Sequence, residues 1–212
     1  MFQMQHSDET LAVWPHKFQL NYIVELKEGG TISTELRCKN TDDSVWKCQT
    51  LLHTYCRIPD ITTLEVSGFK NIRYVDQLNP YAKNKNAILA IEKREKATVD
   101  CEVDRILHDD LINNKIPDIR LDYTGNSGSC CTLLIKKEAT YDSGTGNDTN
   151  DTAQLPCDVV FWNAWVDKCK SLGDMDNDAY KNYVCIEPGT VSNFVPVESN
   201  AVLSLKQTLT AL

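Results

Sequence analysis

The chain has 212 residues, a net charge of -8 and a sequence pI of about 5.0, and its lysines and arginines are scattered rather than clustered. This charge pattern excludes a general nucleic-acid binder, which needs a basic face. Hydrophobic residues make up 42% of the chain, enough for a buried core, and no apolar run approaches the roughly 20 residues of a membrane span.

The first clear elements are two strands around a pair of glycines. In FQLNYIVEL, residues 18–26, apolar side chains alternate with mostly polar ones, which is the period of a strand with one buried face. Gly29 and Gly30 supply a turn, and TISTELRCK returns as a second strand. The segment is therefore predicted to form a β-hairpin.

Short strands separated by turn residues are expected along most of the remaining chain. They are predicted at 47–58, 63–67, 87–92, 97–103, 130–137, 157–161, 181–187 and 202–208. Many short strands with frequent turns favour an all-β sandwich or barrel over a βαβ fold. Because the sequence shows no internal repeat and no linker, residues 1–212 are predicted to form a single domain.

One helix and one loop are expected among these strands. In FWNAWVDKCKSL, the residues Trp162, Trp165, Val166 and Cys169 recur at the spacing of a short helix with an apolar stripe. The stretch 140–154, TYDSGTGNDTNDTAQ, is rich in Gly, Asn, Asp and Thr. That composition predicts an exposed, mobile loop.

The nine cysteines include no CxxC pair and no histidine at the spacing of a zinc site. Several of them lie among apolar residues, which indicates reduced, buried thiols. The N-terminal MFQMQHSDET also lacks the basic start and apolar stretch of a secretory signal. We therefore expect a cytoplasmic protein.

The segment LLHTYCRIPDI places three polar side chains on one face of a strand. If residues 51–58 are extended, His53, Tyr55 and Arg57 point one way and the residues between them point the other way. Such a face can line a sugar site. The alternative is a solvated strand face with an incidental histidine.

A second candidate is Glu187, which ends an apolar strand in YKNYVCIEPGTV directly before Pro188 and Gly189. Partial burial at such a place raises the pKa of a carboxylate and suits a general base. The alternative is a surface glutamate at a turn.

The acidic segment VDCEVDRIL is the third candidate. Asp100, Glu102 and Asp104 are predicted to share one strand face, where they could hold sugar hydroxyls or simply face water. The D-x-E-x-D pattern lacks the glycine and the terminal glutamate of a calcium loop, so no metal site is predicted. Dinucleotide-binding, P-loop, zinc-protease and nucleophile-elbow motifs are also absent from the sequence.

Taken together and in this order, the segments resemble the hexose-6-phosphate mutarotases (glucose-6-phosphate 1-epimerases) of the aldose 1-epimerase superfamily. The similar stretches are WPHKFQLNYIVEL, LLHTYCRIPDI, VSGFKNIRYVDQL, VDRI, DVVFWNAWVDKCKSLGDMDNDAYKNYVCIEPGTV and LSLKQTL, and they cover most of residues 14–208. The resemblance implies an all-β, galactose-mutarotase-like β-sandwich with one short helix and the sugar in a groove of its concave sheet. Family members carry further chain before the WPHKF segment, so the resemblance also implies an N-terminally truncated member.

The resemblance assigns roles to three residues. His53 matches the family's general acid, Glu187 its general base, and Asp104 an acidic residue that binds sugar hydroxyls. It implies that the α and β anomers of a hexose 6-phosphate are interconverted by ring opening, without a metal and without an organic cofactor.

Two functions stay open at this point. In the family, arginines before the WPHKF segment hold the 6-phosphate, and the two segments that carry them are missing from this sequence. The chain could be a hexose-6-phosphate epimerase, or a non-catalytic carbohydrate-binding β-sandwich that lacks the phosphate clamp. We expect a monomer whose partner is the small-molecule sugar, with no nucleic acid and no membrane.

Overall fold

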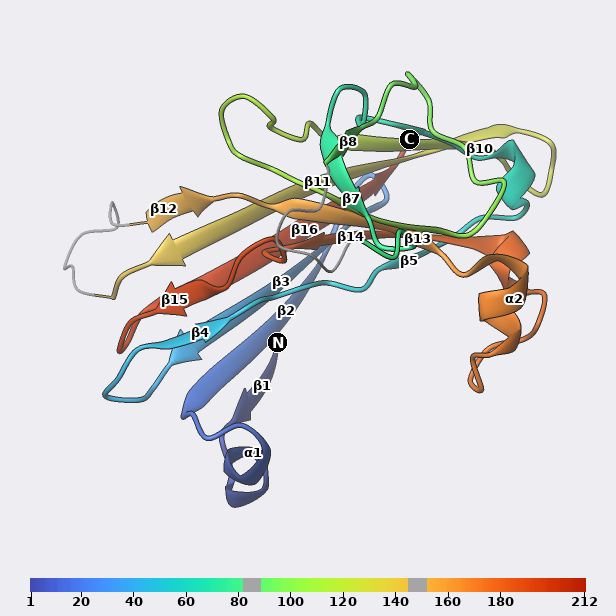
Figure 1. The fold of residues 1–212 in the computed structure, drawn as a ribbon. Coiled ribbons are helices and arrows are strands. Elements are labelled where there is room, and N and C mark those ends of the chain that lie inside the picture. Colours follow the sequence, from blue (N-terminus) through green and yellow to red (C-terminus); the bar gives the residue numbers. More distant parts are fainter. Residues whose placement is uncertain (82–88, 145–151) are drawn as a thin grey trace.

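Two antiparallel sheets lie face to face in the computed structural model, which describes residues 1–81, 89–144 and 152–212 (Figure 1). The larger sheet has eight strands within these residues, and β12 (Thr152–Leu155) pairs with β11 beside its main path. The main path runs β1 (Phe2–Gln5), β2 (Phe18–Lys27), β3 (Thr31–Asn40), β16 (Val202–Ala211), β11 (Cys130–Asp142), β10 (Ile119–Thr124) and β6 (Glu65–Ser67).

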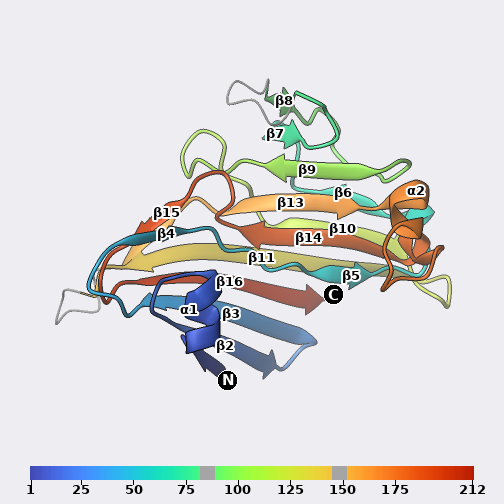
Figure 2. The same cartoon turned by 60° about the horizontal axis from the view of Figure 1, so that its bottom comes forward.

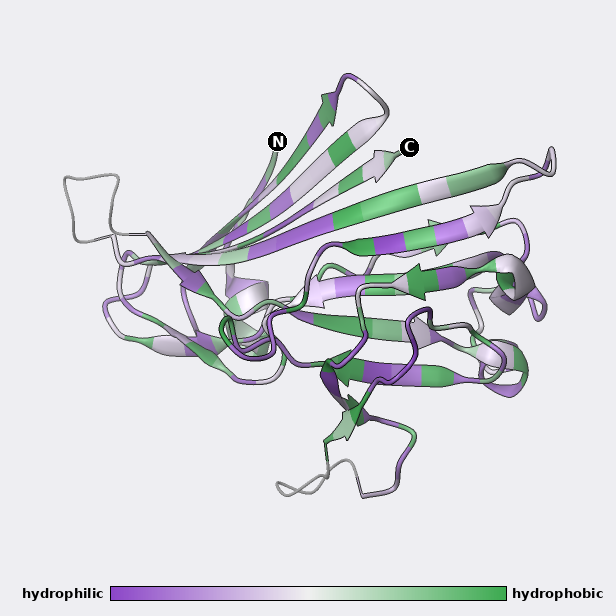
Figure 3. Ribbon diagram, turned by 90° about the horizontal axis from the view of Figure 1, so that it is seen from above, coloured by the Kyte–Doolittle hydropathy of each residue, from purple (hydrophilic) through white to green (hydrophobic). Residues whose placement is uncertain are grey.

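The second sheet has six strands in the described part of the chain. Its order is β5 (Tyr55–Arg57), β14 (Tyr183–Gly189), β13 (Asp158–Asn163), β9 (Val103–Leu107), β7 (Arg73–Asp76) and β8 (Ala90–Ile91). Residues on alternate positions of these strands face the larger sheet, and Figure 3 shows the matching alternation of hydrophobic and hydrophilic residues.

The main core lies between the two sheets. Phe161 of β13 and Ile186 of β14 meet Leu121 of β10 and Ile135 of β11 in one cluster of buried residues. None of these four side chains is more than 1% exposed. Truncating such a side chain to alanine costs about 2–5 kcal/mol, so this core fixes how the six-stranded sheet sits on the larger one.

A small sheet made of β4 (Trp46–Cys48) and β15 (Val195–Val197) supports a second cluster of buried residues. Trp46 and Val197 pack there with Phe18, Cys38 and Leu203 from the larger sheet. Figure 2 shows β2 and β3 beyond the β5 edge of the six-stranded sheet, and the small sheet to the left of β13 and β14.

The predicted hairpin is confirmed, whereas some other predicted strands have different limits. Lys27 of β2 pairs with Thr31 of β3, and Gly29 and Gly30 between them have φ angles of 72° and 68°, which favour glycine. The segment predicted as one strand at 47–58 is split between β4 and β5, which belong to different sheets.

The strand predicted at 97–103 is wrong. Ala97, Val99 and Val103 are buried, but Cys101 is exposed and the backbone there makes only an isolated bridge from Ala97 to Val66. The continuous pairing begins at Val103, where β9 lies between β7 and β13. The strands β1, β7, β10, β12 and β15 were not predicted.

The described residues contain two short α-helices rather than the single one expected. The helix α2 (Trp165–Lys170) lies in the predicted segment but is shorter, because Trp162 belongs to strand β13. The helix α1 (Asp8–Val13) was not predicted, although its N-cap Ser7 forms a capping box with Thr10. Short 3₁₀ helices span Ile61–Thr63 and Ala179–Asn182.

The loop predicted at 140–154 is shorter than expected. Residues 140–142 belong to β11 and residues 152–154 to β12, and the two strands pair from Asp142 and Thr152 onward. Residues 145–151 lie outside the described part of the chain. No helix among the described residues has the length and apolar character needed to span a membrane.

Candidate active site

Strand register brings His53 and Glu187 side by side at one edge of the six-stranded sheet. Tyr55 pairs with Cys185, and an isolated bridge joins Leu51 to Gly189 on the same two segments. His53 lies midway between Leu51 and Tyr55, just as Glu187 lies midway between Gly189 and Cys185. The two residues are therefore direct cross-strand neighbours, whose side chains leave the sheet on the same face.

This face is the outer face of the six-stranded sheet, turned away from the main core. Ile186 and Val184 of β14 point into the core, so Glu187 and Cys185 point outward. The Nδ1 atom of His53 is 3.4 Å from the Oε1 atom of Glu187. An imidazole and a carboxylate at this separation can exchange protons with one small substrate.

Glu187 is the more buried member of the pair. It is 2% exposed, and its Oε1 atom has no hydrogen-bond partner among the described residues. Burial, together with the negative charge of Asp104, raises the pKa of Glu187 to about 7. A carboxylate that titrates near neutral pH is suited to act as a general base.

His53 is half-exposed and belongs to a cluster of aromatic rings. Its ring stacks on Tyr55 with centroids 4.9 Å apart and lies edge-on to Trp162 at 5.8 Å. Tyr183 completes the cluster, with ring contacts to both Tyr55 and Trp162. Burial lowers the pKa of His53 below its ordinary value. A half-exposed aromatic surface with a few polar groups is typical of a small-molecule site.

Asp104 lies on the same face, two strands away from Glu187. It pairs in register with Trp162 of β13, and Trp162 pairs in turn with Cys185 of β14. Burial and the charges of Glu102 and Asp76 raise the pKa of Asp104. The structure therefore brings together all three residues to which the sequence assigns a role in the site.

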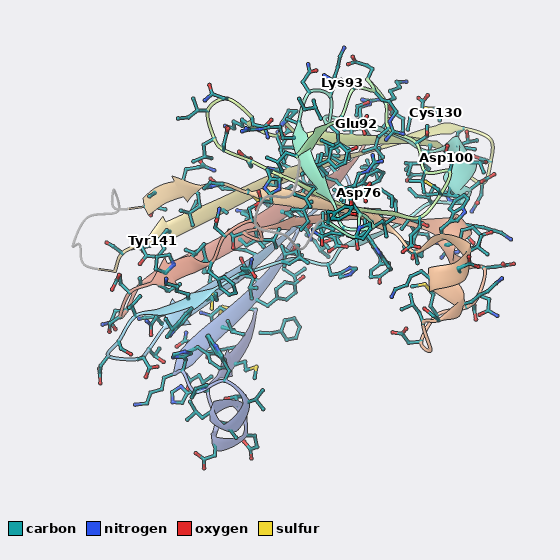
Figure 4. The ribbon with its side chains drawn as sticks, in the orientation of Figure 1. Asp76, Glu92, Lys93, Asp100, Cys130 and Tyr141 are labelled. Carbon is teal, nitrogen blue, oxygen red and sulfur yellow. The ribbon has the colours of Figure 1, made fainter. Side chains whose placement is uncertain are left out.

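The expected acidic strand face is not formed. Strand β9 begins at Val103, so Asp100 and Glu102 lie before it, and Asp100 is exposed. Figure 4 shows Asp100 well apart from Asp76, which ends β7. Of the three predicted carboxylates, only Asp104 is held by strand pairing.

A buried amide holds the segment that carries His53. Gln207 of β16 is 5% exposed and contacts the Thr54 hydroxyl, to which its Nε2 atom lies at 2.7 Å. The same Nε2 atom lies 3.0 Å from the hydroxyl of Thr34 on β3. Through these contacts the larger sheet fixes the position of the residue next to His53.

Asn163 shapes the other end of the aromatic cluster. Its buried side chain donates to the carbonyl oxygens of Tyr180 and Tyr183 and accepts a hydrogen bond from the backbone N–H of Trp165. These bonds lie where β13 ends, at Asn163, and where α2 begins, at Trp165. Trp162 was predicted only as part of a helix, although the apolar run at residues 159–162 continues the strand predicted at 157–161.

Two arginines of the six-stranded sheet are paired with carboxylates. Arg105 of β9 lies on the core side and contacts Glu92, with 3.1 Å between Nη1 and Oε2. Its guanidinium group also lies over the Tyr74 ring, 4.7 Å from the centroid. Arg73 is 2.8 Å from Asp110. These pairs neutralise Arg73 and Arg105, whereas Arg57 is exposed at the end of β5, the strand that follows His53.

Comparison with known proteins agrees with this fold. The family model described as aldose 1-epimerase matches residues 1–210. The chain therefore belongs to the aldose 1-epimerase family. The features described above therefore occur in a member of this family: the strand pairing, the outward-facing histidine and carboxylates, and the aromatic cluster.

Curated relatives are similar over most of this chain. A protein of Cenchrus ciliaris named "Putative glucose-6-phosphate 1-epimerase" is 28% identical over 190 residues, which are 89% of this chain and 49% of the relative. A protein of the same name from Escherichia coli K12 is 25% identical over 98% of this chain and 58% of its own length. The chain thus spans about half the length of the curated relatives it matches.

Solved structures confirm the galactose-mutarotase-like β-sandwich expected from the sequence. A putative mutarotase from Salmonella typhimurium superposes with a TM-score of 0.73 at 22% identity, over 99% of this chain and 59% of that one. A galactose mutarotase-like protein from Clostridium acetobutylicum gives a TM-score of 0.65 at 14% identity, over 99% and 61%. At these identities the likeness establishes the fold.

Proposed function

We propose that the chain interconverts the α and β anomers of a hexose 6-phosphate, with Glu187 as general base, His53 as general acid and Asp104 as a ligand of the sugar hydroxyls. The observation that carries this proposal is the contact of 3.4 Å between His53 and a buried, outward-facing Glu187. Family membership supports the class of reaction. The names of the curated relatives support the phosphorylated sugar.

The reaction needs one proton removed and one proton supplied. Ionised Glu187 takes the proton from the anomeric hydroxyl while protonated His53 gives a proton to the ring oxygen, and the bond between C1 and the ring oxygen breaks. Rotation about C1–C2 turns the resulting aldehyde. On closure, His53 recovers its proton from the former ring oxygen and Glu187 returns its proton to the anomeric oxygen, so no proton is gained or lost.

The shifted pKa values fit this exchange. The pKa of Glu187 is raised to about 7, and burial lowers that of His53 below its ordinary value. The raised pKa makes Glu187 a stronger base, and the lowered pKa makes protonated His53 a stronger acid. No metal and no organic cofactor takes part in the proposed mechanism.

The test is NMR exchange spectroscopy on glucose 6-phosphate at anomeric equilibrium, with and without the protein. We expect faster exchange between the two anomers with the wild-type chain, and no acceleration above background with Glu187→Gln. A folded wild-type chain that leaves the exchange rate unchanged would contradict the proposal.

A second candidate is sugar binding without catalysis, which the pairing of Arg73 and Arg105 with carboxylates favours. The same experiment separates the two functions. A binding protein would show chemical-shift changes on titration with the sugar but no acceleration of anomer exchange.

We further propose that residues 1–212 act as one mutarotase-like domain and as a monomer, because all three site residues come from one sheet of one chain. We also propose a cytoplasmic location, which the nine free cysteines of the described residues support. Size-exclusion chromatography with light scattering and cell fractionation test these two statements.

A further inference from the structure

Three different ligand atoms converge at the site: a ring nitrogen of His53, the thiol sulfur of Cys185 and a carboxylate oxygen of Glu187. These atoms all lie within 4.8 Å of one another. The convergence follows from strand geometry, because Cys185 and Glu187 are two residues apart on β14 and His53 is the cross-strand neighbour of Glu187.

We propose that His53, Cys185 and Glu187 form a binding site for a thiophilic divalent cation such as Zn²⁺, and that the ion excludes the sugar reaction. Nitrogen, sulfur and oxygen donors are the ones that Zn²⁺ takes in proteins. Three protein ligands with a fourth position left to water are the usual arrangement of an open zinc site. Binding as such is independent of the proposed function, whereas the inhibition rests on it.

The buried carboxylate of Glu187, whose Oε1 atom lies 3.4 Å from the His53 ring but accepts no hydrogen bond within the described residues, is a second observation that points to a cation. The Oε1 atom of Glu187 is buried and has no hydrogen-bond partner among the described residues, and the residue is 2% exposed. A buried ionised carboxylate is costly unless a positive charge or a hydrogen-bond donor compensates it. A bound cation supplies that charge at the position of Oε1.

The geometry is close to what the metal requires. Zinc–ligand distances of about 2.0–2.3 Å bring neighbouring ligand atoms to within about 4 Å of each other. The widest separation of 4.8 Å must therefore shrink by about 1 Å. His53 can supply this movement, because 49% of its side chain is exposed, whereas Cys185 is fully buried.

The donor set selects the kind of metal. Magnesium and calcium ions prefer six or more oxygen ligands, and this site offers one carboxylate. Thiolate and imidazole favour zinc and neighbouring transition metals. The ion would coordinate the lone pairs of the proposed acid and base, so the metal-bound form cannot move protons to or from the sugar.

The binding test uses calorimetric titration of the 212-residue chain with Zn²⁺ and optical titration with Co²⁺. We expect one site per chain and a sulfur-to-cobalt charge-transfer band. Cys185→Ser should weaken Zn²⁺ binding at least tenfold and remove the band. Because Cys185 is buried, Cys185→Ala serves as a second variant, and circular dichroism reports whether each variant is folded.

The matched control is the double variant Cys38→Ser, Cys48→Ser. These two cysteines also lie together, at one pocket next to β3 and β4, and they could bind a metal independently. We expect the double variant to retain wild-type affinity. Unchanged affinity in folded Cys185 variants, or loss of binding in the double variant alone, would overturn the proposed site.

The inhibition test is separate. If the wild-type chain accelerates anomer exchange, Zn²⁺ should abolish the acceleration, a chelator should restore it, and Cys185→Ser should stay active at Zn²⁺ concentrations that inhibit the wild type. Equal inhibition of both proteins would refute exclusion of the sugar reaction by this site. A chain that binds Zn²⁺ through Cys185 but accelerates no exchange would refute the proposed function and leave the metal site standing.

Discussion

Replacing Glu187 with glutamine is expected to abolish the acceleration of anomer exchange by the protein and, at the same time, to stabilise the fold at alkaline pH. The pKa of Glu187 is raised from 4.5 to about 7, first by burial and then by the charge of Asp104. The folded chain therefore holds a proton on Glu187 between these two pH values, whereas the unfolded chain does not. The free energy of unfolding should fall as the pH rises from about 4.5 to about 7, and the loss is complete above that range.

The size of the effect follows from the same shift. A pKa change from 4.5 to about 7 corresponds to a cost on the order of 3 kcal/mol for the ionised folded state. Glutamine has nearly the same shape and no charge, so Glu187→Gln avoids this cost. We expect the variant to be more stable than the wild type by about 2–3 kcal/mol at about pH 8.5, with a much smaller difference at about pH 5.

The assay is urea unfolding followed by tryptophan fluorescence at both pH values, combined with NMR exchange of the sugar anomers. Removal of a positioned base should lower the exchange rate by about 10²–10⁴-fold. The control is Glu28→Gln at an exposed position, which should change the stability by less than about 0.5 kcal/mol. A stability difference that does not depend on pH would refute the argument from burial, and unchanged exchange would show that Glu187 is not the base.

Three further predictions concern the surroundings of this pair. Asp104→Asn should raise the KM about tenfold or more and move the acidic limb of the pH profile of kcat/KM to lower pH, because the charge of Asp104 helps to raise the pKa of Glu187. Asn163→Ala should lower the free energy of unfolding by about 2–4 kcal/mol, measured against the exposed Asn193→Ala, since three buried hydrogen bonds are lost. Calorimetry should show less than a tenfold preference of the 212-residue chain for glucose 6-phosphate over glucose, because Arg73 is paired with Asp110; a stronger preference would reveal an additional basic pocket.

Prediction from the sequence was most accurate where the local residue pattern agrees with the observed strand pairing. Residues 18–27 and 31–40 alternate around two glycines, and they form the predicted hairpin. The contact between His53 and Glu187 is different, because the two residues are far apart in the chain and meet only through the pairing of segment 51–57 with β14. Alternation could place each side chain on a face, but the pairing of the two strands was implied only by the family resemblance.

The incorrect secondary-structure predictions also have physical causes. Ala97 and Val99 alternate as strand residues do, but they lack a continuous partner strand and stay irregular. Trp162 fits a helical spacing with Trp165, yet the hydrogen bond from the Trp165 N–H to Asn163 starts the helix after it. The first pattern fails because a strand needs a continuous partner, and the second fails because a local side-chain hydrogen bond sets where the helix begins. The helix α1 could have been found from the capping residues Ser7 and Thr10.

The different positions of His53 and Glu187 in the sheet have a consequence for how the protein would lose activity. Glu187 lies in a strand with neighbours on both sides, whereas His53 belongs to the edge segment, which Thr54 and Gln207 anchor to the larger sheet. Edge segments open by local fluctuations that need less free energy than global unfolding. Mild heat or denaturant would therefore separate the proposed acid from the proposed base while the core between the sheets is still intact. In that case, a fall in the catalytic rate would indicate that the sheet edge has opened. The spectroscopic melting transition would indicate the later unfolding of the core.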